Sequence, residues 1–257
     1  MRKFLKITRI TIEAVLNIPS YIMALLAIIL YWFFRLFGMK KTAERVSRFC
    51  CYLVCIWIMF TLGAKVHVEG KENLPHKGES VVYAPNHNSL IDVPLFYMAL
   101  GHFPAMMAKK ELFKVPLLHG LLVSLSCIKI DRKGAHSIVE AVRTGSTMIG
   151  DGHSLVIFPE GTRSKTGEIG TFKNGAFKIA ERTGCAVVPV VIKNDRYLLE
   201  SAHNLKRIDV WIKFLPPIET KALDVEEQKN LGQVVEGMVK EEWAKLPGEK
   251  KRKENRS

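Results

Sequence analysis

Residues 80–100 read SVVYAPNHNSLIDVPLFYMAL, and the character of the chain changes twice within this stretch. The run Ser80–Ala84 is rich in β-branched and aromatic residues, which is typical of a buried strand, and Pro85 then forces a turn. From Leu90 to Leu100 the apolar residues continue over a helical length. A strand, a polar turn and a helix in this order predict one unit of an α/β layered domain.

The same alternation of short apolar runs and helical periods extends from Lys65 almost to the end of the chain. Further strands are expected at Lys65–Val68, Ala105–Ala108, Cys127–Ile130, Leu155–Phe158, Ala186–Ile192 and Val210–Phe214. Further helices are expected at Glu111–Ser124, Ala135–Ile149, Gly175–Arg182 and Val225–Trp243, with a break at Pro116. In an α/β domain functional side chains gather on the loops that leave the strand ends, so a site is expected there.

The first quarter of the 257-residue chain is both its most basic and its most apolar part. Residues 1–64 hold nine basic and two acidic residues, within a chain whose net charge is +13. Two uncharged runs, Ala14–Phe34 and Phe49–Ala64, would form helices of about 32 and 24 Å at ~1.5 Å per residue. Only the first is long enough to cross a hydrocarbon core of about 30 Å.

Basic clusters flank both runs: Arg2, Lys3, Lys6 and Arg9 precede the first, and the connector Arg35–Arg48 separates the two. Because basic flanks prefer the cytoplasmic side, a hairpin that dips into one leaflet keeps every cluster on that side. We therefore expect residues 1–64 to be a monotopic two-helix anchor on the inner (cytoplasmic) membrane, attracted by anionic lipids. The domain 65–247 would then lie on the cytoplasmic side, and 248–257 would be a basic disordered tail. A hairpin that spans the bilayer and a buried hairpin of a soluble protein remain alternatives.

The turn after Ala84 carries a histidine and an aspartate five residues apart, His87 and Asp92. Ser89 is a good N-cap, which would make Asp92 the third helical residue, with its side chain pointing back toward the helix N-terminus. The bend lets imidazole and carboxylate meet, and such a pair can act as an oriented general base. The plainer interpretation is a capping box of Ser89 and Asp92, with His87 as an ordinary loop residue. The local pattern leaves both open.

A second polar loop, Phe158-Pro-Glu-Gly-Thr-Arg-Ser164, follows the apolar run that begins at Leu155. Arg163 offers a planar fork for a phosphate or carboxylate, and Gly161 permits a tight turn. Glu160 could hold Arg163 or contact a hydroxyl. The alternative is a surface turn with an ion pair.

Three more cations are candidates for an anion site. Arg132 lies at the end of a predicted strand, Lys109 follows another, and Lys173 precedes a helix. In isolation, a pairing of Arg132 with Asp131 and solvation of Lys109 are the more common arrangements, and Lys173 is either a second cation of the site or a solvated loop lysine.

Other chemistries lack their sequence signatures. Five Cys without a CxxC pair do not make a disulfide framework or a zinc module, and no G-x-S-x-G, H-E-x-x-H or complete P-loop occurs. The positive charge is densest beside the apolar runs, which favours a membrane over a nucleic acid. No metal, no cofactor and no nucleic-acid partner are therefore expected.

Four blocks in order resemble the glycerophospholipid acyltransferase family, and within it the bacterial 1-acyl-sn-glycerol-3-phosphate acyltransferases. They are Asn86–Asp92 with its His-x-x-x-x-Asp spacing, Ile128–Arg132, Phe158–Arg163 and Val188–Val190, and the resemblance extends over residues 65–220. It implies a mixed, mostly parallel sheet flanked by helices, preceded by the two-helix anchor.

The resemblance further implies transfer of a fatty acyl group from a thioester, of acyl carrier protein or coenzyme A, to the 2-hydroxyl of lysophosphatidic acid, giving phosphatidic acid. It implies that His87 is the general base and that Asp92 orients it, without a metal or a covalent acyl-enzyme. On the substrate side it implies Arg163, Glu160, Gly161, Thr162 and Arg132, with Lys109 or Lys173. The alternatives are a sibling enzyme that acylates glycerol 3-phosphate or another lysophospholipid, and a non-catalytic membrane-binding protein of the same fold.

Overall fold

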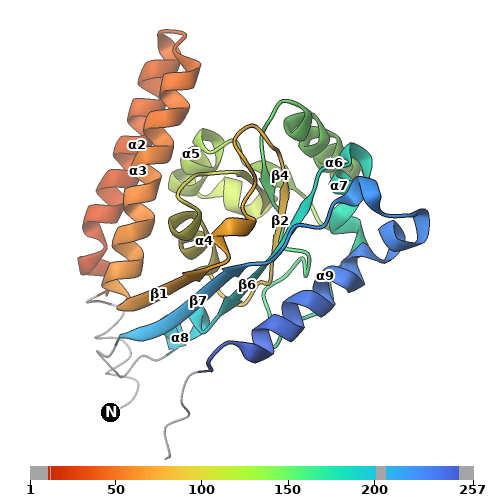
Figure 1. Cartoon of the computed structure of the whole chain (residues 1–257). Coiled ribbons are helices and arrows are strands. Elements are labelled where there is room, and N and C mark those ends of the chain that lie inside the picture. Colours follow the sequence, from red (N-terminus) through yellow and green to blue (C-terminus); the bar gives the residue numbers. More distant parts are fainter. Residues whose placement is uncertain (1–10, 12, 201–206, 249–257) are drawn as a thin grey trace, which may run out of the picture.

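The structure is a computed structural model that describes residues 11, 13–200 and 207–248 (Figure 1). The basic cluster before residue 10 and the tail from 249 onward lie outside the described residues. Within the described part, seven strands form one sheet in the order β1-β7-β6-β2-β5-β3-β4. Their bounds are β1 Ala64–Glu69, β2 Val82–Pro85, β3 Ala105–Lys109, β4 Ile128–Ile130, β5 Leu155–Val156, β6 Val187–Lys193 and β7 Ile208–Phe214.

The sheet is mixed and mostly parallel, as the sequence blocks predict. Strand β2 lies between β5 and β6 and is parallel to both, and β3 is parallel to β5 and β4. Strand β7 runs antiparallel to β6 and parallel to β1. The five strands β6, β2, β5, β3 and β4 therefore present their C-terminal ends at one edge of the sheet.

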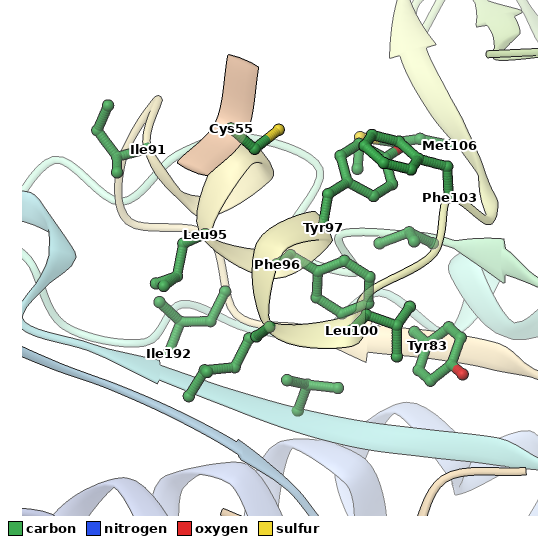
Figure 2. Packing of buried hydrophobic residues seen from close by; sticks show 14 of the residues in the cluster. Cys55, Tyr83, Ile91, Leu95, Phe96, Tyr97, Leu100, Phe103, Met106 and Ile192 are labelled. Carbon is green, nitrogen blue, oxygen red and sulfur yellow. The ribbon is translucent and has the colours of Figure 1, made fainter. Parts of the chain in front are cut away.

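Alternating side chains of the strands pack into two separate cores. Tyr83 joins the core under α4, whereas Val82 and Ala84 join the core on the other face, because successive strand residues point to opposite sides. Helices α6 (Ala135–Gly150), α7 (Lys178–Thr183) and α9 (Val225–Lys245) cover that second face (Figure 1). Figure 2 shows the first core, where Leu95 and Phe96 of α4 (Asp92–Leu100) pack near Ile192 and Tyr83.

Two long antiparallel helices, α2 (Ile18–Leu36) and α3 (Lys40–Thr61), stand beside α4 and α5 (Pro116–Ser124) (Figure 1). Ser47 of α3 donates a buried 2.7 Å hydrogen bond to Ser124 of α5. Helix α2 also packs closely on α5 at Gly120. A Cβ on Gly120 would lie only 2.7 Å from Ile28 Cδ1, so the position has no room for a side chain. One face of the hairpin is therefore part of the domain's first core.

The predicted connector between the two helices, Arg35–Arg48, is too long. The turn between the helices comprises only residues 37–39, and Lys40 through Arg48 form the first turns of α3. Lysine and arginine are good helix formers, and Glu44 lies one turn before Arg48, with 3.8 Å between the charged groups, so charge does not interrupt the helix. Among the described helices, α2 alone is long and apolar enough to cross a membrane.

All seven predicted strands are present, and the differences lie in the helices. The helix predicted at Glu111–Ser124 does break at Pro116, and its first part is a 3₁₀ segment, Lys110–Lys114. The helix predicted at Gly175–Arg182 likewise begins as a 3₁₀ turn, Asn174–Phe177, before α7. Helix α8 (Asp195–Glu200) and the 3₁₀ turns Lys71–Asn73 and Thr220–Ala222 were not predicted, because segments this short carry little periodicity.

Candidate active site

Loops from three neighbouring parallel strands meet at the C-terminal edge of the sheet. His87 follows β2, the loop 158–164 follows β5, and Asn194 with Asp195 follows β6. Arg132 comes from the end of β4, farther along the same edge. Because these strands are parallel, residues up to 108 positions apart in the sequence are brought to one side of the molecule.

His87 and Asp92 are in direct contact, which is one of the two arrangements that the local pattern leaves open. The distance from His87 Nδ1 to Asp92 Oδ2 is 2.6 Å, and Asp92 is fully buried whereas 15% of the His87 side chain is exposed. Within the described residues Nε2 of His87 has no hydrogen-bond partner. With the Nδ1 proton donated to the carboxylate, Nε2 carries the lone pair and can accept a proton.

The helix begins differently from the prediction. Asp92 is the first residue of α4 rather than the third, and Ile91 holds the N-cap position. Its carboxylate nevertheless reaches backward, accepting hydrogen bonds from the backbone N–H groups of Asn88 (2.8 Å) and Ser89 (3.0 Å). The Ser89 hydroxyl accepts from the Ile91 N–H at 3.3 Å. The capping role and the contact with His87 therefore coexist, since Oδ2 serves both.

Glu160 contacts His87, not Arg163. Its buried carboxylate accepts the His87 backbone N–H at 2.7 Å and the Gly170 N–H at 3.0 Å. The carbonyl of His87 accepts a 2.8 Å hydrogen bond from the Ser164 N–H. Both backbone groups of His87 are thus held by the loop that follows β5. The predicted ion pair of Glu160 with Arg163 is absent from the described contacts, because the two backbone donors already occupy the carboxylate.

Phe158 of the same loop stacks on the imidazole, with 4.1 Å between ring centroids. Burial lowers the pKa of His87, and Arg163 and Arg132 lower it further against the opposing effect of Glu160. The imidazole is therefore uncharged at neutral pH, as a general base must be. Burial raises the pKa of Asp92, while the two backbone N–H groups favour its ionised form.

The predicted cations are distributed unequally around this pair. Arg163 and Thr162 are exposed, and Arg163 makes no hydrogen bond or ion pair within the described residues. Arg132 donates to the carbonyl of Gly161, which ties the end of β4 to the same loop. Its predicted alternative partner, Asp131, pairs with Lys110 instead.

Of the two candidate lysines, Lys173 lies at the site. A Cβ added to Gly161, whose φ is +73°, would lie 3.2 Å from its Nζ, so glycine leaves room for this lysine. Lys109 instead pairs with Glu111 at 3.5 Å on the exposed surface.

A cavity of about 240 Å³ opens beside the loop 158–164. Its wall is mostly apolar and includes Ile138, Val142 and Ile157, whereas Arg132, Lys173 and Gly161 lie on its polar side. Phe158 lines the cavity and also stacks on His87, so the cavity adjoins the imidazole. Among the described residues, the site included, no group of three or more His, Cys, Asp or Glu side chains is placed to hold a metal ion.

Sequence reasoning missed two buried residues of this edge. The amide of Asn86 donates to the Ile192 carbonyl at 2.9 Å and accepts the Ile192 N–H at 2.7 Å, which joins the ends of β2 and β6. Asp195 is fully buried and contacts the Asp92 side chain. Its position just after the predicted strand Ala186–Ile192 was the available signal, because a polar residue at the end of a central parallel strand faces the site edge.

A neutral imidazole held by a buried carboxylate, beside an arginine-bearing loop at the C-terminal edge of an α/β sheet, can accept a proton from a hydroxyl while the arginine holds an anionic group nearby. Residues 65–193, half of the chain, match the family described as Acyltransferase. The protein belongs to this acyltransferase family.

Named relatives agree with that assignment. The chain is 30% identical over 176 residues to the chloroplast 1-acyl-sn-glycerol-3-phosphate acyltransferase of Arabidopsis thaliana, covering 68% of this chain and 49% of the relative. It is 28% identical over 190 residues to the 1-acyl-sn-glycerol-3-phosphate acyltransferase of Borreliella burgdorferi, covering 74% of each. The chain therefore spans about half the length of the plant relative.

A solved structure extends the similarity beyond the matched domain. The 1-acyl-sn-glycerophosphate (LPA) acyltransferase of Thermotoga maritima superposes with a TM-score of 0.71 at 27% identity, over 95% of this chain and 100% of that one. The coverage includes most of the N-terminal hairpin.

Proposed function

We propose that this protein transfers a fatty acyl group from a thioester to the 2-hydroxyl of lysophosphatidic acid and so forms phosphatidic acid. The observation that carries the proposal is the 2.6 Å contact between His87 Nδ1 and Asp92 Oδ2, which leaves Nε2 open at the edge of the sheet. The names of the relatives from Arabidopsis and Thermotoga support the choice of acceptor.

In this reaction Nε2 of His87 takes the proton from the acceptor hydroxyl as its oxygen attacks the thioester carbonyl. Asp92 stabilises the imidazolium that forms, and the buried geometry keeps the ring in one tautomer. The tetrahedral intermediate then collapses by breaking the C–S bond, and the imidazolium returns the proton to the departing sulfur. A positioned base contributes about 10²–10⁴-fold to such a rate, and the rest comes from holding the two substrates together.

The acceptor phosphate is assigned to the cations of the loop 158–164. Arg163 is exposed and uncommitted among the described contacts, and its planar fork suits two phosphate oxygens. Arg132 and Lys173 lie on the polar side of the neighbouring cavity and supply further positive charge. Gly161 and Thr162 lie directly before Arg163 in the same loop, and the Gly161 carbonyl accepts a hydrogen bond from Arg132. Lys109 is left out of the proposal because of its pairing with Glu111.

The apolar cavity beside Phe158 suits part of an acyl chain. Its 240 Å³ lies below the ~300–1,000 Å³ of pockets that enclose a whole drug-sized ligand. Ile138, Val142 and Ile157 line it with apolar side chains. A fatty chain bound against them would leave no polar group without a hydrogen bond.

The hairpin α2–α3 is assigned as a monotopic anchor on the inner face of the cytoplasmic membrane. Its outer face exposes large apolar side chains, among them Ile22, Leu25 and Ile29 of α2 and Phe60 of α3. Its inner face packs against α4 and α5. If the hairpin crossed the whole bilayer, it would therefore carry those two helices into the membrane. Insertion into one leaflet avoids that cost and brings lipid substrates to the site.

Turnover with purified protein in mixed micelles tests the proposal. Acyl-coenzyme A and acyl-[acyl carrier protein] are each offered with lysophosphatidic acid, glycerol 3-phosphate and a lysophospholipid that has a larger headgroup. We expect phosphatidic acid with lysophosphatidic acid as acceptor, and the better thioester identifies the donor. Preference for another acceptor would indicate a sibling enzyme, and absence of transfer with every pair would indicate a non-catalytic member of the family.

A further inference from the structure

Behind the His87–Asp92 pair lies a second buried aspartate that the proposed mechanism does not use. Asp195 begins α8 directly after β6, the strand beside β2, and both Asp195 and Asp92 have no exposed surface. Each side chain lies within range to act on the pKa of the other through a hydrogen bond. Two carboxylates in one dry contact need a proton between them, because two acceptors facing each other would repel and stay unsatisfied.

The surrounding donors decide which aspartate carries that proton. Oδ2 of Asp92 already accepts from His87 Nδ1 and from the backbone N–H groups of Asn88 and Ser89, all of which favour the ionised form. Oδ1 of Asp92 and both oxygens of Asp195 have no hydrogen-bond partner of good geometry within the described residues. A proton on Asp195 satisfies one oxygen of each side chain at once.

We propose that Asp195 is a positioning residue that stays protonated at neutral pH and donates a hydrogen bond to Oδ1 of Asp92, which keeps Asp92 ionised beneath His87. This inference deepens the proposed function and rests on it for its catalytic consequence. The result is a chain of three groups, a neutral acid, a carboxylate and an imidazole, reaching from the interior to the accessible edge.

The electrostatic surroundings agree with this assignment. Burial raises the pKa of Asp195 well above its ordinary value, and the neighbouring Asp92 raises it further, whereas the backbone N–H groups of Arg196 and of Asp195 itself have smaller opposing effects. The hydrogen bond from Asp195 acts in the opposite direction on Asp92 and lowers its pKa against the effect of burial. The other charged groups that act on the three-group chain are Glu160, Arg163 and Arg132. Without the donor, Asp92 would itself take the proton near neutral pH and would cease to stabilise the imidazolium.

Two substitutions separate hydrogen-bond donation from charge. Asp195→Asn keeps a donor of nearly the same shape but cannot titrate, whereas Asp195→Leu keeps the branched skeleton with larger methyl groups and removes the donor. The control is Asp151→Asn, an exposed aspartate just after α6 on the opposite edge of the sheet. For each protein kcat/KM for the thioester is measured from pH 5 to 9, and Tm is measured over the same range.

We expect Asp195→Asn to retain kcat/KM within about threefold, and Asp195→Leu to lose about tenfold or more, as is typical when a supporting hydrogen bond is removed. We also expect the acid limb of the pH profile to move upward by about one unit in Asp195→Leu only. If Asp195→Asn loses as much activity as Asp195→Leu, or if neither variant moves the acid limb, the proposal is wrong.

The Tm series tests the protonation state without relying on activity or on folding of the leucine variant. An aspartate whose pKa is raised by folding contributes stability below its ordinary pKa of ~3.9 and loses it as the pH rises toward the folded-state value. The Tm of Asp195→Asn relative to the wild type should therefore rise from pH 5 to pH 8, while Asp151→Asn shows no such trend. A relative Tm that stays constant from pH 5 to pH 8 would mean that Asp195 is ionised in the folded protein, because the carboxylate would then bind no proton in either the folded or the unfolded state over this range. Absence of transfer by the wild type would refute the proposed function and leave this measurement valid.

Discussion

His87 is restrained through its backbone, through Nδ1 and through one face of its ring. Its backbone N–H and carbonyl are held by Glu160 and Ser164, its Nδ1 by Asp92, and its ring face by Phe158. A base that is fixed in this way loses little conformational freedom when substrate binds. The loop 158–164 thus positions the histidine in addition to any contact with the acceptor.

The contact with Asp92 could be predicted because five residues and a bend confine both side chains to one small region. The partners of Glu160 and the neighbour of Asp92 could not, because 73 residues separate His87 from Glu160 and Asp195 lies on another strand. Such contacts depend on strand order, which no local pattern encodes. The same reason explains why Arg132 was paired with its sequence neighbour Asp131 instead of with Gly161.

The pH dependence of kcat/KM follows from the burial of the imidazole. Because burial lowers the pKa of His87, its protonation moves to more acid pH than the ~6.5 of an exposed histidine. We expect kcat/KM for the thioester, with saturating acceptor, to be level above pH 7 and to decline only below about pH 6.5. An acid limb centred above pH 7 would contradict the assignment of a buried neutral base.

Arg163 should affect the acceptor more than the thioester. We expect Arg163→Ala to raise the KM for lysophosphatidic acid at least about tenfold, since charge-assisted hydrogen bonds contribute ~1.5–3 kcal/mol. Arg163→Lys should restore part of this, because an ammonium cannot make the two-pronged contact. The control is Arg182→Ala, an exposed arginine of α7. Unchanged acceptor kinetics in Arg163→Ala would remove the residue from the site.

At the scale of elements, the strands were predicted more accurately than the helix ends. The central strands β2, β5 and β6 are almost entirely apolar, and their alternate residues pack into the two cores. Helix starts depend on capping: α4 begins at Asp92, two residues later than predicted, because the side chains of Ser89 and Asp92 bond to the preceding turn. The polar–apolar pattern does not contain that information.

Helix α6 packs so closely on the sheet that one of its positions has no room for a side chain. A Cβ on Gly145 would lie 2.3 Å from Ile179 Cδ1 and 3.1 Å from Leu155 Cδ1. We expect Gly145→Ala to destabilise the protein by about 1–3 kcal/mol in denaturant unfolding, despite the better helix propensity of alanine. Gly237→Ala in α9, with nothing within 4 Å, should instead stabilise by up to about 1 kcal/mol. Equal effects at the two positions would contradict the close packing.

At the scale of the molecule, the hairpin α2–α3 has an unusual distribution of residue sizes. Small residues such as Ala24 and Ala27 are buried, whereas Ile22, Leu25 and Ile29 face outward with more than half of their surface exposed. The inner face allows close packing, and the outer face forms an apolar patch of the kind that marks a membrane contact. The sequence predicted two apolar helices but not which side of them the domain would cover.

This outer face should determine membrane binding. We expect the triple variant Ile22→Ser, Leu25→Ser, Ile29→Ser to bind anionic vesicles at least about tenfold more weakly, since each large apolar side chain contributes roughly 1 kcal/mol or more when buried in lipid. The control, Val225→Ser with Val234→Ser, alters exposed apolar residues of α9 on the other side of the sheet. Flotation of each protein with vesicles gives the comparison. Equal binding by both variants would refute the anchor.

The most direct test of the whole account is the rate of acyl transfer to lysophosphatidic acid by the wild type and by His87→Ala in the same micelles. Alanine removes the imidazole from a loop and leaves the cores intact, so the variant should fold with an unchanged far-UV spectrum. We expect its kcat to fall by about 10²–10⁴-fold, the contribution of a positioned general base. A folded His87→Ala protein that retained more than about a tenth of the wild-type rate would contradict the account, given that expected factor.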